Sequence, residues 1–223
     1  MQDQELPFWE RPEVVERFAG RDPDRRLASW LSECDRTEEL RVLDIGCAGG
    51  RNSQYLARAG CDLYAIDASE PMVRRTRLRV GEVLGEREAA RRVRKGRMEN
   101  LGGYSDGMFD LVVALGVYHG APDRKTFEQA LAETARVLAR GGTLLVSNFA
   151  PGTMLEGVRL EPLTGEPGVY LGHDAGRHFL LAAEELDELF AGCGLYPEVP
   201  TTTVVAEGES YRRITVNGHY RKT

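Results

Sequence analysis

The chain has 223 residues, of which 42% are apolar, enough for one globular domain with its own core. No apolar run approaches the roughly 18 residues of a membrane span, and the acidic residues 1–5 do not begin a secretory signal. The formal net charge of −6 argues against bulk attraction to nucleic acid. Four scattered cysteines, with no Cys-x-x-Cys pair, predict reduced thiols in a cytoplasmic protein.

Helix and strand signals alternate through the first half of the chain. Two short helices are predicted within residues 8–34, on either side of a Gly-Arg-Asp-Pro break. Further along, strands are expected at 41–45, 62–66 and 93–96, and helices at 52–59 and 71–85.

The second half begins with a near-continuous apolar run over 109–115, which is typical of a strand buried on both faces of a parallel sheet. A periodic helix over 124–138 should end at a Gly-Gly pair before a strand over 143–149. Residues 150–180 lack clear periodicity. A helix over 183–192 and a β-hairpin of strands 202–206 and 211–216 complete the chain.

This alternation predicts an α/β fold with a doubly wound, mostly parallel sheet and an antiparallel C-terminal hairpin strand. We expect a single domain over 1–223. Its parts are a helical cap at 1–38, a cofactor-binding core at 39–150, a substrate lid at 151–180, and the last helix and hairpin at 181–223. The loops after residues 45, 67, 96 and 115 should line one crevice at the carboxyl ends of the strands.

The strongest local feature is the glycine loop, residues 44–50, which reads Asp-Ile-Gly-Cys-Ala-Gly-Gly. Small residues let a ligand approach the backbone, and the next helix presents free N–H groups. The loop lacks the Gly-x-Gly-x-x-Gly spacing of dinucleotide sites, because Ala48 and Arg51 occupy positions that require glycine. Asp44 would repel a pyrophosphate but would favour the cationic amine of an amino-acid moiety.

Residues 42–52 resemble motif I of the class I methyltransferases that depend on S-adenosylmethionine (SAM). The resemblance continues in order over about residues 40–150. It covers the second-strand motif at 64–69, the adenine-flanking motif at 96–101, motif IV at 109–112 and the turn into the fifth strand at 138–144. The chain departs from the family at Ala48, where glycine is usual, and at Arg97, where aspartate is frequent.

The resemblance implies a SAM-dependent enzyme with a Rossmann-like, three-layer fold around a seven-stranded sheet. It assigns the ribose hydroxyls to Asp67. Arg97 is expected to stack on the adenine, and Arg17 to close over the methionine end. The expected cofactor-binding residues are Asp44, Gly46, Cys47, Ala48, Gly49, Asp67, Ala68, Arg97, Met98, Glu99, Leu115 and Arg17. The alternatives are a capping role for Asp44, a turn at Asp67, plain packing for Met98 and an exposed Arg17.

Residues 115–120 follow the fourth strand at the mouth of the predicted crevice. His119 titrates near neutrality and could serve as a general base, with Tyr118 beside it as the second candidate catalytic residue or as a pocket wall. The alternative is a structural histidine. The lid contains the polar residues Tyr170, His173, Asp174 and His178. They could meet the acceptor, or they are simply solvent-exposed polar side chains.

The predicted function is methyl transfer to a small-molecule acceptor, with oxygen as the first choice of accepting atom. The motif-IV strand is followed neither by an Asn/Asp-Pro-Pro-aromatic sequence nor by a carboxylate cluster for magnesium, so we expect no metal. An RNA or protein methyltransferase that uses the basic residues 74–97 is an alternative, although a solvated helix face explains these charges as well. A non-catalytic SAM-binding regulator is another, favoured if the crevice beside His119 is closed. The chain could be a monomer or a homodimer.

Overall fold

The computed structural model describes residues 6–173 and 175–223. The chain divides into two compact units, Met1–Arg97 and Met98–Thr223, here called unit 1 and unit 2. The expectations for residues 1–5 and for Asp174 of the lid lie outside the described residues. The single domain and its internal boundaries stay a prediction. Every helix within the described ranges is too short or too polar to cross a membrane.

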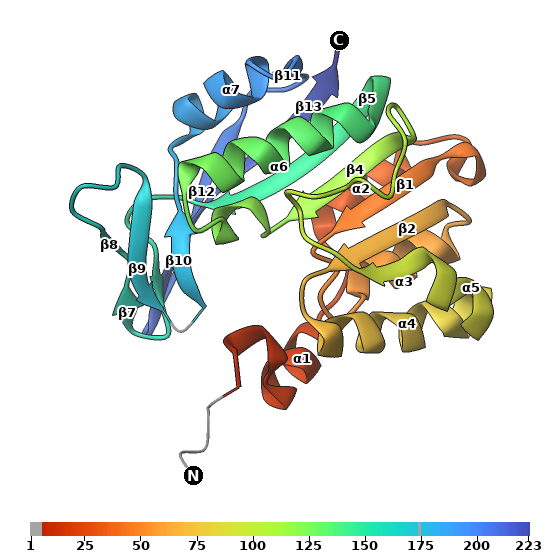
Figure 1. Cartoon of the computed structure of the whole chain (residues 1–223), viewed down its shortest axis with the longest axis horizontal. Coiled ribbons are helices and arrows are strands. Elements are labelled where there is room, and N and C mark those ends of the chain that lie inside the picture. Colours follow the sequence, from red (N-terminus) through yellow and green to blue (C-terminus); the bar gives the residue numbers. More distant parts are fainter. Residues whose placement is uncertain (1–5, 174) are drawn as a thin grey trace. The chain divides into compact units, whose positions relative to one another are not determined.

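Unit 1 is built on three parallel strands in the order β3-β2-β1, with helices packed around them (Figure 1). The strands are β1 (Arg41–Ile45), β2 (Asp62–Asp67) and β3 (Val93–Lys95). The helices are η1 (Phe8–Glu10), α1 (Pro12–Ala19), α2 (Arg25–Ser32), η2 (Thr37–Glu39), α3 (Arg51–Arg58), α4 (Glu70–Leu84) and α5 (Glu86–Arg92). Ile45 pairs with Ile66, so the loops that follow β1 and β2 leave the same edge of the sheet.

The bounds of α4 follow from its terminal residues. Ser69 is the N-cap, and its side-chain oxygen accepts a hydrogen bond from the N–H of Met72 at 3.4 Å, with Pro71 in the first turn. Gly85, with φ of 84°, ends the helix. The sequence predicts one helix over 71–85, but α5 begins directly after Gly85, because this residue redirects the backbone without a loop.

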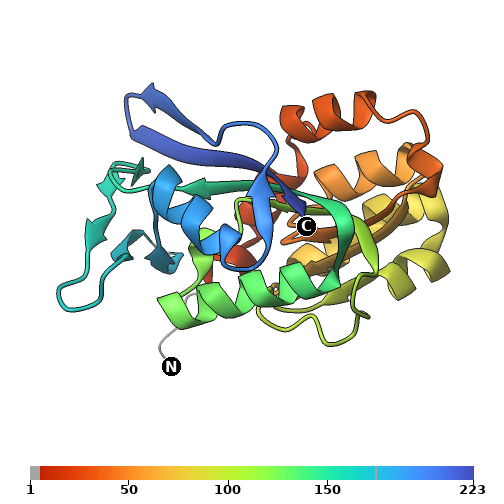
Figure 2. The same cartoon turned by 90° about the horizontal axis from the view of Figure 1, so that it is seen from above.

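Unit 2 combines a parallel pair of strands with an antiparallel hairpin. β4 (Phe109–Leu115) and β5 (Leu138–Phe149) are parallel. β13 (Tyr211–Lys222) pairs antiparallel with both β5 and β12 (Thr202–Gly208), and Figure 2 shows β12 and β13 as a long ribbon. The predicted antiparallel C-terminal strand is therefore present. The other elements here are η3 (Tyr118–Gly120), α6 (Arg124–Val137), α7 (Ala183–Ala191) and β11 (Leu195–Pro197).

α6 packs against β5 through one apolar face (Figure 1). Its buried residues recur at helical spacing and are Phe127, Ala130, Leu131, Thr134, Ala135 and Val137. Asp123 caps the helix, accepting a hydrogen bond from the N–H of Thr126 at 2.7 Å. The periodic pattern of the sequence thus gives this helix correctly.

The Gly141-Gly142 pair lies inside β5 and does not form the turn that the sequence predicts. β5 begins at Leu138, which pairs with Phe109, while Thr143 pairs with Leu111. The extra residues of β5 between these pairs form a bulge. A Cβ on Gly142 would lie 2.9 Å from the carbonyl oxygen of Ala139, so this close approach requires glycine.

Residues 151–180, predicted as an irregular lid, contain several short strands. β8 (Glu161–Pro162), β9 (Val169–His173) and β10 (Gly176–Phe179) form a separate antiparallel sheet. β6 (Met154–Leu155) and β7 (Val158–Arg159) form a small hairpin before it. β10 lies against η3 and so covers the residues that follow β4.

Candidate functional site

The loop between β1 and α3 bends through left-handed residues. Gly46, Ala48 and Gly50 have φ of 68°, 47° and 83°. The N–H groups of Gly46 and Cys47 donate to the carbonyl oxygen of Ile66 at 2.8 and 3.0 Å, which ties the loop to the end of β2. The loop therefore leads into the N-terminus of α3 along a fixed path.

Asp44 is a buried carboxyl group at the end of β1, 2% exposed. The hydroxyl of Ser53 on α3 donates to its Oδ2 at 2.6 Å. Burial raises the pKa of Asp44 from its ordinary 3.8 to about 7, against the opposing effects of Ser53 and Arg51. The negative charge of the nearby Asp67 also raises the pKa of Asp44. A carboxylate in this environment favours a cationic ligand group, since its charge is otherwise poorly compensated.

Asp67 ends β2 and holds the glycine loop. Its Oδ2 accepts a hydrogen bond from the N–H of Ala48 at 2.9 Å, and its Oδ1 accepts one from the N–H of Ser69 at 2.8 Å. Burial raises the pKa of Asp67, while these backbone hydrogen bonds lower it. The structure thus brings Asp44, Asp67 and the loop together, with Ala68 exposed beside them.

The C-terminal end of α1 lies directly on this loop. A Cβ on Gly49 would stand 2.5 Å from the Cα and N atoms of Ala19, and the guanidinium of Arg79 donates to the Ala19 carbonyl at 2.5 Å. On the same helix, the guanidinium of Arg17 lies 5.8 Å from the ring centre of Phe8. The predicted contact of Arg17 with the cofactor stays a prediction.

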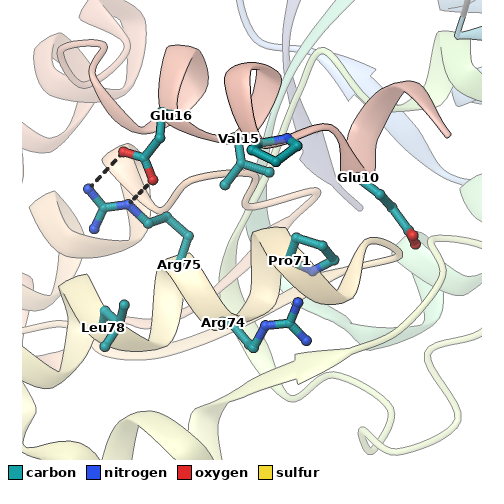
Figure 3. A pocket seen from close by; sticks show the side chains of 8 residues that line it. Glu10, Val15, Glu16, Pro71, Arg74, Arg75 and Leu78 are labelled. Carbon is teal, nitrogen blue, oxygen red and sulfur yellow. Dashed lines mark hydrogen bonds and ion pairs between the residues drawn. The ribbon is translucent and has the colours of Figure 1, made fainter. Parts of the chain in front are cut away.

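A surface cavity of about 330 Å³ lies between α1 and α4 (Figure 3). Val15, Pro71 and Leu78 contribute apolar surface to it, and Glu16 and Arg75 form an ion pair at 3.1 Å across it. The predicted cofactor residues are absent from its lining, so this cavity is separate from the glycine loop.

The remaining predicted cofactor residues lie on either side of the boundary between the units. Arg97 is exposed after β3 in unit 1. In unit 2, Met98 and Glu99 are half-buried, and Leu115 is the half-buried last residue of β4. Their predicted roles stay predictions.

Tyr118 and His119 lie on η3, directly after β4. The Tyr118 side chain has no exposed surface, and its hydroxyl lies 2.7 Å from that of Thr134 on α6. Burial raises its pKa. Tyr118 therefore packs into the core of unit 2, and the catalytic role predicted for it is not favoured by this geometry.

His119 is also buried, with 5% of its surface exposed. Its Nδ1 accepts a hydrogen bond from the N–H of Phe149 at 3.2 Å, so the neutral ring carries its proton on Nε2. Burial, together with the neighbouring His178, lowers the pKa of His119 to about 3. The ring is therefore neutral at physiological pH, and its predicted role as a base stays a prediction.

Comparison with known proteins identifies the core of the chain. Residues 43–146 match a family described as methyltransferase domain. This segment is a class I, SAM-dependent methyltransferase domain. The family predicted from the glycine loop, the enzyme class and SAM as the cofactor are thereby confirmed for this domain.

One curated relative is the ubiquinone biosynthesis O-methyltransferase of Caulobacter sp. (strain K31), 34% identical over 115 residues. That match covers 50% of this chain and 42% of the relative, so the chain spans less than half the length of this protein.

Solved structures share the fold at low sequence identity. A SAM-dependent methyltransferase from Methanosarcina mazei has a TM-score of 0.66 at 19% identity and covers 91% of this chain and 99% of its own. Magnesium protoporphyrin IX methyltransferase from Synechocystis, with bound S-adenosylhomocysteine, has a TM-score of 0.63 at 20% identity and covers 95% and 94%. The predicted fold class, an α/β fold with a mostly parallel sheet and an antiparallel C-terminal strand, is confirmed. The expected count of seven strands is wrong, because additional short strands join the sheet among the described residues.

The residues of unit 1 fit SAM on three counts. Asp44 is buried, and none of the ion pairs found among the described residues involves it, so the cofactor's ammonium would supply the missing charge. The left-handed φ values of the loop are of the kind that small residues adopt where a backbone can approach a ligand closely. Asp67 offers a carboxylate at the end of the next strand, suited to the ribose hydroxyls.

Ala48 is strained in this methyltransferase domain, which explains the glycine usual at its position in the family. Its φ of 47° costs an L-residue with a Cβ about 1 kcal/mol or more. We expect Ala48→Gly to stabilise the fold by about 1 kcal/mol, or a rise in Tm of roughly 2–4 °C. Thermal unfolding without ligand measures this.

Ala57→Gly is the matched control, because Ala57 is a buried residue of the helix α3. Glycine there should destabilise by about 1 kcal/mol. If Ala48→Gly is as destabilising as Ala57→Gly, the strain at Ala48 is refuted.

Most arginines of the basic segment 74–97 have partners within unit 1. Arg92 forms ion pairs with Asp62 and Glu88. Further arginines of this segment that donate hydrogen bonds are Arg75, Arg77, Arg79, Arg91 and Arg94. These contacts support the interpretation of the segment as a solvated helical face.

Sequence reasoning missed the polar surroundings of His119. Asn148, near the end of β5, accepts a hydrogen bond from the His119 N–H at 3.3 Å through its Oδ1. The ring centre of His178 on β10 lies 6.0 Å from that of His119. His178 appears in the sequence only as one of several lid residues, and no local pattern connects it to Asn148.

Proposed function

We propose that the protein transfers the methyl group of SAM to a hydroxyl group of a small molecule in the cytoplasm. The observation that carries this proposal is the arrangement of Asp44, the glycine loop and Asp67 in unit 1. SAM supplies a methyl group already activated on a sulfonium. The protein therefore needs mainly to bind and align the two reactants and to exclude water.

Four residues of unit 1 have distinct tasks in this proposal. Asp44 balances the charge of the cofactor's ammonium, and Asp67 binds its ribose. Ser53 orients the Asp44 carboxylate through the 2.6 Å hydrogen bond from its hydroxyl. Thr76 supports the loop from α4, since its hydroxyl donates to the Ala48 carbonyl at 2.6 Å.

An oxygen acceptor is supported by the name of the curated relative, an O-methyltransferase. This support comes from the shared methyltransferase domain alone, because the match covers 42% of that protein. The RNA or protein methyltransferase alternative loses support, because ion pairs such as Arg92–Asp62 engage the basic segment within unit 1.

A non-catalytic SAM-binding protein is the second candidate, and the burial of His119 favours it. His119 and Asn148 are 5% and 3% exposed, so the surroundings of His119 are closed in this conformation. Catalysis requires that the lid residues 151–180 open to admit an acceptor.

Two measurements test the proposal. Calorimetric titration should show binding of SAM and of S-adenosylhomocysteine, and failure to bind either would overturn the proposal. Incubation of a metabolite extract with methyl-labelled SAM should then yield a labelled methyl ether. Binding without transfer to any component would favour the non-catalytic alternative.

A further inference from the structure

Three buried polar side chains meet in unit 2 around η3. They are His119 on η3, Asn148 near the end of β5 and His178 on β10, each at most 5% exposed. Asn148 contacts the backbone of His119, and the rings of His119 and His178 have centres 6.0 Å apart. We call these residues the His119 cluster.

The cluster contains polar atoms without partners. Neither ring nitrogen of His178 has a hydrogen-bond partner, and neither does Nδ2 of Asn148. Such atoms are rare in folded proteins, because a buried polar group that lacks a partner has lost its hydrogen bonds to water. An apolar residue at position 178 would avoid this cost, so packing gives no reason for His178. Asn148 differs, because its Oδ1 accepts the His119 N–H, and only its Nδ2 is left without a partner.

The hydrogen-bonding capacities of the two histidines differ. His119 accepts the Phe149 N–H on Nδ1, so its Nε2 carries a proton and can only donate. The ring nitrogens of His178 make no hydrogen bond of good geometry, although the nearby His119 backbone acts to raise its pKa; when neutral, the ring has one N–H and one bare nitrogen. Burial lowers the pKa of His178, with the neighbouring His173 acting in the same direction, so the neutral form is favoured.

A ligand group that satisfies the cluster must both donate and accept. A hydroxyl does so, whereas an ammonium only donates and a carboxylate only accepts. We propose that the His119 cluster binds the neutral hydroxyl group of the methyl acceptor, with the bare nitrogen of His178 accepting its O–H and Asn148 Nδ2 donating to an acceptor oxygen. This inference rests on the proposed function, and it assigns to His178 the role that the sequence places on His119.

The proton balance of the reaction follows from this arrangement. As the hydroxyl oxygen forms its bond to the methyl carbon, the carbon–sulfur bond of SAM breaks and S-adenosylhomocysteine forms. The hydroxyl proton moves to the bare nitrogen of His178, and the resulting imidazolium later releases it to water.

Because the cluster is buried, the proposal requires that β10 separate from η3 to admit the acceptor. β10 lies against η3 and carries His178, so the hairpin both covers the cluster and supplies its central residue.

His178→Leu separates a binding role from a structural one. Leucine removes the unpartnered nitrogens, so the variant should melt at or above the wild-type temperature and bind SAM with unchanged affinity. Methyl transfer to the probes catechol and 4-nitrophenol should fall at least 30-fold, and His178→Gln should recover part of it because an amide can donate and accept. His219→Leu, on β13 outside the cluster, should keep activity within twofold.

A readout independent of catalysis is the ring ¹⁵N spectrum of the histidines. The signals of His178 are those that are absent from the spectrum of His178→Leu. With S-adenosylhomocysteine present, 4-nitrophenol should shift these signals, whereas benzylamine and benzoate should not. The inference is overturned if His178→Leu retains wild-type transfer, if benzylamine is the preferred probe, or if the probes give neither transfer nor shifts. The proposed function survives these results as long as the wild type binds SAM and methylates some other acceptor.

Discussion

Replacing Asp67 with alanine should weaken the binding of SAM about 100-fold. Hydrogen bonds to a charged acceptor contribute about 1.5–3 kcal/mol each, so two ribose hydroxyls account for about 3 kcal/mol, or roughly 100-fold in Kd. The side chain also holds the loop through the Ala48 N–H at 2.9 Å, and this support disappears in the variant. Calorimetric titration of SAM into folded Asp67→Ala at neutral pH measures the change.

Asp62→Ala provides the matched control for this experiment. Asp62 is an acid at the other end of β2, paired with Arg41 and Arg92. Its loss should leave the Kd for SAM within twofold, although it removes two surface ion pairs. If Asp67→Ala binds SAM as Asp62→Ala does, Asp67 has no part in the cofactor site.

The sequence predicts unit 1 well because its signals are local. Asp44 stands just before the small residues of the glycine loop and the helix that follows, and Asp67 ends the next strand in the chain. Each of these signals lies within a few neighbouring residues. The strain at Ala48 is not visible, since it depends on a φ of 47° that only the structure supplies. The contact of Gly49 with Ala19 joins residues thirty positions apart, and no pattern in either segment predicts it.

Unit 2 was predicted less completely, for two physical reasons. The Gly141-Gly142 pair has the composition of a turn, but tertiary pairing with β4 places it in a bulge. β13 continues to Lys222, well past the predicted residue 216, because β5 and β11 supply backbone partners for polar residues such as Asn217. The His119 cluster likewise depends on β5, η3 and β10 meeting in the fold, which sequence periodicity does not report.

The affinity for SAM should depend on pH through Asp44. Burial raises the pKa of this carboxyl to about 7, and only its ionised form attracts the cofactor's ammonium. Below about pH 7 binding must first remove a proton, so affinity should fall up to tenfold per pH unit, roughly 100-fold by pH 5. Ser53→Ala should move the midpoint upward, because the Ser53 hydroxyl stabilises the carboxylate.

Asp44→Asn should bind SAM weakly and without this pH dependence. Calorimetric titrations at pH 5, 6, 7 and 8 compare it with the wild type. A wild-type affinity that is constant from pH 5 to 8 would exclude the Asp44 carboxylate as the partner of the ammonium.

The same substitution should stabilise the protein without ligand at high pH. The folded state holds the Asp44 proton more tightly than the unfolded state does, so the free energy of unfolding falls as pH rises from 3.8 to about 7. This rise in the pKa of Asp44 corresponds to a decrease of about 4 kcal/mol in the free energy of unfolding, which is complete above pH 7. Asparagine carries no charge, so urea unfolding at pH 8 should show Asp44→Asn more stable than the wild type, with the difference lost near pH 4. Greater stability together with weaker SAM binding would show that the buried charge serves the cofactor, because a carboxyl group kept for folding would produce the opposite result.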